Sequence, residues 1–219
     1  KALGKPITVV LINGRPASTV KVSEQANAIL EGWYLGEQGG NAVADILFGD
    51  VNPGGKLPVT VPRSAGQLPL FYNMKPSARR GYLFDTTDPL YPFGFGLSYT
   101  SFSFTNLKIS PTQVKVGESL KVTVDVTNTG QVAGDEVVQL YIHDRVGSVT
   151  RPVRELKAFR KVALAPGARE TVTFTLRRAD LEFIGLELKP TVEPGTFDLW
   201  IAPSAQAEGV TGTFELVGA

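Results

Sequence analysis

The run from Ala28 to Pro62 constrains the fold of this 219-residue chain more than any other stretch. Its first part, residues 28–34, has the length and apolar character of a strand, and a glycine-rich turn follows. From Asn41 to Phe48 the apolar residues recur at i, i+3 and i+4, which predicts one buried face of a short helix. Gly49 then suits a helix C-terminus, where positive φ is common.

The second part of the same run returns from helix to strand. Residues 50–55 are turn formers, and residues 57–61 have the pattern of another strand. The order strand, glycine turn, helix, loop, strand predicts an α/β layered fold.

The residues before this run fit the same fold. Ile7 to Ile12 is a continuous β-branched and apolar run, which predicts a strand buried on both faces in a parallel sheet. Residues 20–27 form a helical or irregular crossover to the strand at 28–34. Arg15 follows the first strand at its carboxyl end, the edge where open α/β sheets bind ligands. It therefore either faces a cleft or lies in a solvated or interdomain loop.

Trp33 and Tyr34 end the second strand at the same expected edge. Aromatic rings there can stack on a sugar ring, or they can fill an interface to a neighbouring domain. We favour the interface for these two side chains.

Regular periodicity disappears between Arg63 and Asp88, where prolines interrupt any regular element. A long ordered loop of this kind predicts a segment that wraps one domain and reaches toward a functional edge or a second subunit. Residues 86–105 follow as an aromatic and glycine-rich connector, too apolar for a flexible linker.

Short alternating strands follow this connector. Apolar and polar residues alternate in 120–127, 172–176 and 197–201, and turn signals recur every 8–12 residues, in roughly seven strands. This pattern predicts an immunoglobulin-like β-sandwich, without the antibody disulfide because the chain has no cysteine.

The composition excludes several functions. Net charge is +1, with 22 basic and 21 acidic residues and no basic run, so nothing indicates a nucleic-acid partner. No apolar run approaches the roughly 20 residues of a membrane span. His143 is the only histidine and is expected at the surface, so histidine metal sites and a Ser-His-Asp triad lack their residues. Residues 49–56 have the wrong spacing for a phosphate loop, and no cofactor is indicated.

Three long stretches resemble family 3 of the glycoside hydrolases, the β-glucosidase family. They are GWYLGEQGGNAVADILFGDVNPGGKLPVTVPRS at 32–64, PLYPFGFGLSYTSF at 89–102 and NTGQVAGDEVVQLYI at 128–142. The resemblance implies the end of an α/β sandwich domain followed by a fibronectin type III-like domain. It also implies hydrolysis of terminal β-linked sugars with retention, and it favours a periplasmic or secreted location.

The catalytic carboxylates of the resembling family do not map onto this sequence. Its nucleophilic Asp lies in an N-terminal (β/α)8 barrel, and its acid/base Glu lies on a loop that would precede Lys1. The expected partners are therefore that barrel portion and a carbohydrate substrate, and homodimerisation remains open. Glu37, before the helix, is a candidate for the missing catalytic carboxylate, but we expect it to cap the helix N-terminus. On that basis Glu37→Gln lowers stability without abolishing turnover.

The sequence thus predicts a partial α/β sandwich, an open sheet with flanking helices, in residues 1–85. It also predicts a connector at 86–105 and an immunoglobulin/fibronectin III-like β-sandwich at 106–219. The cleft-edge candidates are Arg15, Trp33 and Glu37. The alternatives are a non-catalytic carbohydrate-binding or structural module, and the same fold in a β-xylosidase or arabinosidase.

Overall fold

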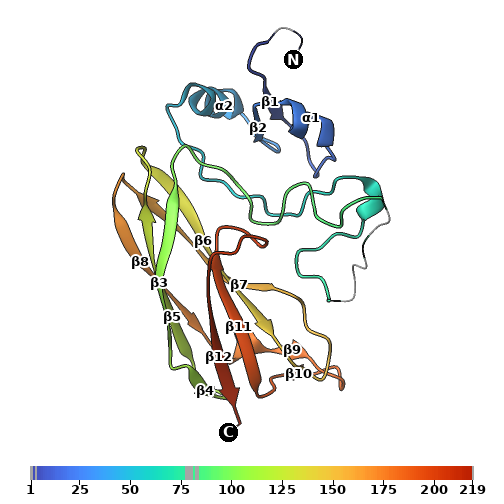
Figure 1. Cartoon of the computed structure of the whole chain (residues 1–219), viewed down its shortest axis with the longest axis vertical. Helices are drawn as coiled ribbons and strands as arrows, with labels where there is room; N and C mark the ends of the chain where they lie inside the picture. Colours follow the sequence, from blue (N-terminus) through green and yellow to red (C-terminus); the bar gives the residue numbers. More distant parts are fainter. Residues whose placement is uncertain (1, 3, 77–80, 82–83, 219) are drawn as a thin grey trace.

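The computed structural model describes residues 2, 4–76, 81 and 84–218, and it has two layered parts joined by a long extended segment (Figure 1). The N-terminal part consists of β1 (Thr8–Leu11), α1 (Val20–Gln25), β2 (Ala28–Glu31) and α2 (Gly39–Phe48). Strands β1 and β2 pair in parallel, with Thr8 opposite Ala28. The predicted parallel α/β unit is therefore confirmed in the described chain.

Three details of this part differ from the sequence reading. Strand β2 ends at Glu31 rather than Tyr34, because Trp33 has a φ of 52° and turns the chain away. In β1 Thr8 is exposed and the other three residues are only partly buried, and Ile12 is 66% exposed, since this sheet has just two strands here. Helix α2 ends as expected, with Gly49 in the left-handed conformation at φ 86°.

The strand expected at residues 57–61 is absent. Val61 makes an isolated bridge to Tyr91, and the Leu57 N–H donates to the Phe95 carbonyl over 2.8 Å. Pro58 and Pro62 carry no N–H, so this stretch cannot support a regular ladder. It runs instead as an extended segment whose partner is the stretch 90–95.

The C-terminal part is a sandwich of two sheets. One sheet has three strands in the order β3-β5-β8, and the other has five in the order β4-β12-β11-β6-β7. Their bounds are β3 Phe102–Ser110, β4 Gln113–Lys115, β5 Leu120–Asn128, β6 Gly134–Asp144, β7 Glu155–Leu164, β8 Arg169–Leu176, β11 Gly195–Ala202 and β12 Val210–Val217. The small elements are η1 Ala65–Gln67, α3 Arg178–Leu181, β9 Phe183–Ile184 and β10 Pro190–Thr191.

The core of the sandwich follows the predicted alternation. In β5 the inward residues Leu120, Val122, Val124 and Val126 are at most 1% exposed, and their neighbours face outward. Phe197 and Phe214 stack across β11 and β12 with ring centroids 5.0 Å apart. The apolar faces of both sheets therefore form one continuous core.

Strand β6 is buried on both of its faces, which simple alternation did not predict. Its outward residues Gln139 and Tyr141 are covered by the described residues of the segment 50–76 and 84–98, which we call the arm. Gln139 Nε2 donates to the carbonyls of Gly94 and Pro203, and Tyr72 stacks on Phe93 at 4.3 Å.

Two further groups of contacts fasten the arm to the sandwich. At one end Lys56 forms an ion pair with Glu136 at 3.0 Å, and both side chains are largely buried. At the other end the Val153 N–H donates to the Met74 carbonyl over 2.9 Å, and Lys75 binds the Thr150 carbonyl. Part of the loop at 63–88 therefore packs on the sandwich, as the expected wrapping of one domain requires, while residues 77–80 and 82–83 lie outside the described structure. The expected reach toward a functional edge or a second subunit stays a prediction.

Candidate functional site

The carboxyl ends of β1 and β2 form a polar cluster at one edge of the small sheet. Glu31 lies at its centre: its carboxylate accepts from Asn13 Nδ2 at 3.4 Å and from the Trp33 N–H at 3.2 Å. The Gly32 N–H also donates to the Leu11 carbonyl over 2.9 Å. The carboxylate thus ties together the ends of both strands, at the edge where α/β sheets bind ligands.

The sequence candidates occupy this edge in different ways. Trp33 is half-buried and joined to Glu31, whereas Arg15 and Glu37 are exposed. Within the described part of the chain neither Arg15 nor Glu37 has a hydrogen bond or ion pair. Tyr34 is 82% exposed, and its ring lies so close to Gly14 that a Cβ there would meet the hydroxyl at 2.5 Å. Only Trp33 among the three candidates therefore belongs to a connected network.

The capping role expected for Glu37 is wrong. The N-cap of α2 is Gln38, which makes no side-chain capping bond, and the first turn of the helix contains no acidic residue. The glycine turn places the helix start two residues beyond Glu37. Loss of stability in Glu37→Gln is accordingly no longer expected.

Sequence reasoning missed Asn13 and Glu31. A signal was available, because a carboxylate closes the otherwise apolar strand 28–31 and an amide follows the apolar strand 8–11. The Asn13 Oδ1 atom is buried and has no hydrogen-bond partner in the described structure.

Beside this edge, a mostly apolar hollow lies between α2 and the sheet. Its lining includes Val10, Ile12, Tyr34, Leu35 and Val43. Leu47 and Phe48 at the end of α2 are also apolar and exposed. Patches of this kind mark surfaces that contact other protein segments.

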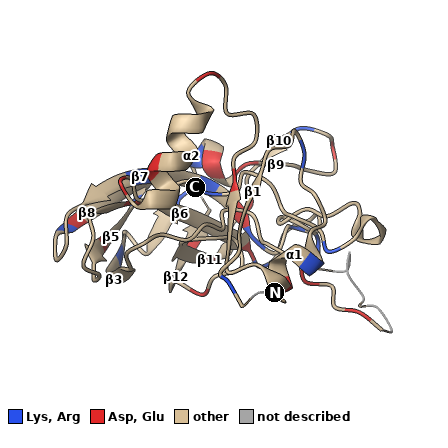
Figure 2. Cartoon of the chain, turned by 90° about the horizontal axis from the view of Figure 1, so that it is seen from above, with Lys and Arg blue, Asp and Glu red and all other residues tan. Residues whose placement is uncertain are grey.

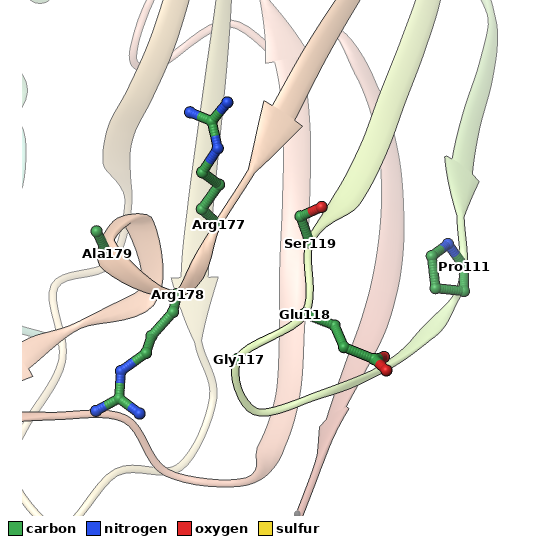
Figure 3. A pocket seen from close by; sticks show the side chains of 7 residues that line it. All are labelled: Pro111, Gly117, Glu118, Ser119, Arg177, Arg178 and Ala179. Atoms are coloured by element: carbon green, nitrogen blue, oxygen red, sulfur yellow. The ribbon is translucent and has the colours of Figure 1, made fainter.

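A second hollow at the opposite end of the molecule has a charged lining but no convergent site. It lies between the turn that precedes β5 and helix α3 (Figure 3). Arg177, Arg178 and Glu118 point in different directions there, and Arg178 is paired with Glu182 at 2.9 Å. These side chains therefore do not surround one position that a ligand could fill.

His143 is not the surface residue that the sequence suggested. It is half-buried, and its Nδ1 lies 2.6 Å from the Pro152 carbonyl. Its neighbour Asp144 is buried, and burial raises the pKa of that carboxyl although Arg151 lies 3.8 Å away. Among the described residues no group of His, Asp and Glu has the arrangement of a metal site. This cluster holds the loop between β6 and β7 in place.

The distribution of charged side chains and the length of the helices bear on nucleic-acid and membrane partners. Figure 2 shows Lys and Arg interspersed with Asp and Glu rather than gathered on one face. In the described part of the chain, no helix is long and apolar enough to cross a bilayer.

Comparison with known proteins identifies the family to which this chain belongs. Residues 1–99 match the model of the glycosyl hydrolase family 3 C-terminal domain, and residues 136–205 match a fibronectin type III-like domain. The chain belongs to glycoside hydrolase family 3, and it corresponds to the C-terminal segment of proteins in this family.

Individual relatives agree with this assignment. The chain is 44% identical to a periplasmic β-glucosidase of Salmonella typhimurium, over 99% of this chain and 30% of the relative. It is 46% identical to a β-xylosidase of Formosa agariphila, over 94% of this chain and 29% of the relative. The chain thus spans about a third or less of the length of these relatives.

Solved structures have the same fold. A β-glucosidase of Listeria innocua in complex with glucose superposes with a TM-score of 0.94 at 37% identity, over 99% of this chain and 32% of that chain. A β-glucosidase of Erythrobacter marinus gives 0.95 at 46% identity, over 99% and 29%. The partial α/β sandwich followed by a β-sandwich is therefore the fold of this family segment.

Proposed function

We propose that this chain is the non-catalytic C-terminal segment of a retaining β-glucosidase-like hydrolase that releases terminal β-linked glucose. The observation that carries the proposal is the family match over residues 1–99, together with about 99% coverage of this chain by a β-glucosidase relative. Retaining hydrolysis needs two carboxyl groups about 5–5.5 Å apart. In this proposal both lie outside this sequence: the nucleophile on the barrel portion and the acid/base on a loop of the α/β sandwich domain.

The small sheet supports a docking role toward that barrel portion. It has two strands, Ile12 directly after β1 is exposed, and an apolar hollow lies beside α2. Exposed sheet edges and apolar faces are normally covered in a folded protein. We assign their cover to the N-terminal portion of the same hydrolase, in a periplasmic or secreted enzyme.

A β-xylosidase is the second candidate, because two relatives from Formosa agariphila, at 46% and 47% identity, carry that name. The division at residues 85 and 105 is likewise a proposal, and strand β3 already begins at Phe102. An accessory carbohydrate-binding module remains the non-enzymatic alternative.

A chimera tests the proposed function. This chain replaces the matching segment of the Salmonella enzyme, and the chimera is assayed with aryl β-glucoside and aryl β-xyloside. We expect hydrolysis of the glucoside by the chimera and none by the isolated chain. Turnover by the isolated chain, or a folded chimera that cleaves neither substrate, would contradict the proposal.

A binding measurement addresses the accessory-module alternative. Isolated residues 102–219 are titrated with glucose oligosaccharides by calorimetry. Measurable binding by this sandwich would favour the module.

A further inference from the structure

The network at the carboxyl edge of the small sheet contains a backbone outlier. Trp33 has a φ of 52°, in the left-handed region that favours glycine. For a bulky side chain this conformation is a genuine outlier. A glycine stands on its immediate N-terminal side, at position 32, so the sequence could have placed the turn there without strain.

The surrounding contacts hold Trp33 in that conformation. Its N–H donates to Glu31 Oε1 over 3.2 Å, and Asn13 Nδ2 contacts the other oxygen of the same carboxylate at 3.4 Å. The Gly32 N–H is bound to Leu11, so the residue before the outlier is fixed to the neighbouring strand. Strained residues that are held in this way cluster at functional sites.

The strained turn sets where the indole lies. Because β2 ends at Glu31, the chain leaves the sheet at Trp33 and does not continue its alternation. The ring is half-buried, so part of it is available to another group. It lies beyond the carboxyl ends of both parallel strands, where open α/β sheets bind ligands.

In place of the interface role that the sequence favoured, we propose that Trp33 forms part of the substrate-cleft wall in the assembled hydrolase, and that Glu31 is the positioning residue that holds it there. The ligand is the β-linked sugar, whose apolar C–H face packs on the indole. Glu31 acts by accepting two hydrogen bonds rather than by its charge. This inference rests on the proposed function.

A catalytic role and a positioning role for Glu31 predict different results from conservative substitutions. Glu31→Gln retains an oxygen that accepts from the Trp33 N–H, and the Asn13 amide can turn to accept from the new NH2 group. Glu31→Ala removes both acceptors. A catalytic carboxylate would lose its activity in both variants, whereas a positioning residue is rescued by glutamine.

The experiment uses the chimera described above and measures kcat and KM for an aryl β-glucoside, with melting temperature alongside. We expect Trp33→Gly, which fits the backbone without strain, to lose about 100-fold in kcat/KM, as misplacement of a substrate does. Trp33→Phe retains a ring and loses less. Glu31→Ala loses about 10-fold, and Glu31→Gln stays within about threefold of the parent.

The matched control is Trp200→Phe in β11, a tryptophan that packs under Arg154 with 4.4 Å from guanidinium carbon to ring centroid. It lies on the sandwich, and its kcat/KM should match that of the parent. If Trp33→Gly melts earlier but retains kcat/KM, Trp33 only packs an interface and the inference is overturned. Equal losses in Glu31→Gln and Glu31→Ala overturn the positioning role. An inactive parent chimera overturns the proposed function and this inference with it.

Discussion

At the scale of single residues, the ion pair between Lys56 and Glu136 joins the arm to the sandwich. The two side chains are 11% and 7% exposed, and Lys56 Nζ also donates to the Gly96 carbonyl over 3.1 Å. Both charges are therefore out of water but paired. Removing one partner of such a pair leaves an uncompensated buried charge, which is far more costly than losing a surface pair.

Lys56→Met should lower the free energy of unfolding by about 3 kcal/mol, because it leaves the Glu136 carboxylate buried and unpaired. The matched control is Lys161→Met, which breaks a 2.7 Å pair with Asp135 whose side chains are 54% and 38% exposed. That loss should stay below about 1 kcal/mol. Urea unfolding of the chain measures both, and equal losses would contradict the prediction.

Asp144 and Asp125 should change stability with pH in opposite directions. Burial raises the pKa of Asp144, so its ionised form costs stability above the folded pKa, and this cost fades as the pH falls toward about 4. Hydrogen bonds from Asn106 and Thr171 lower the pKa of Asp125, so its contribution is present at neutral pH and is lost below about pH 4.

Urea unfolding between pH 7 and pH 3 checks this pair. Relative to Asp144→Asn, the parent should gain stability as the pH falls. Relative to Asp125→Asn, the parent should lose stability at the acid end. The same sign for both residues would show that burial does not dominate at Asp144.

At the scale of elements, the arm depends on aromatic packing rather than on a regular ladder. Tyr72 stacks on Phe93 at 4.3 Å and meets Tyr141 edge-on at 6.1 Å. Its hydroxyl accepts from the Leu156 N–H over 3.2 Å, and burial raises the pKa of this phenol, which therefore stays neutral. One side chain thus connects the arm to β6 and to β7.

Tyr72→Ala should release this part of the arm, with a loss of about 2–3 kcal/mol in unfolding free energy, since a large ring is removed from a packed site. Tyr72→Phe retains both ring contacts and loses only one acceptor, at a cost of about 1 kcal/mol. Limited proteolysis at residues 68–76 provides a second measurement. Cleavage of the alanine variant no faster than that of the phenylalanine variant would refute the anchoring role.

At the scale of the whole molecule, the arm belongs physically to the sandwich. Among the described residues the buried apolar side chains begin at Val61, and none lies in β1, α1, β2 or α2. Hydrogen bonds from Tyr91 to Ser23 and from Tyr99 to the Ile46 carbonyl connect the N-terminal elements to the arm. The N-terminal elements therefore lack a core of their own in this chain.

Residues 50–219 should consequently fold without residues 1–49. We expect this fragment to unfold cooperatively in urea, with a midpoint close to that of the full chain, because the buried core is unchanged. Protease should remove the first 49 residues from the full chain and leave the remainder intact. A fragment that is unfolded, or whose midpoint falls well below that of the full chain, would contradict this view.

The sequence alone determined the elements whose burial follows a simple period. Strands such as β5 alternate because one face meets the core, and α2 ends at Gly49 because glycine accepts the left-handed conformation. Three long motifs placed the chain in its family, and the matches to residues 1–99 and 136–205 confirm this.

The tertiary structure alone decided where non-local partners lie. The sequence predicted a strand at residues 57–61, and only the fold shows that this stretch instead makes isolated backbone bonds to residues 91–95. Likewise Glu31 looked like an ordinary strand residue until the parallel pairing brought Asn13 beside it. Periodicity records which face of an element is apolar, whereas contacts between residues far apart in the chain depend on how the elements pack.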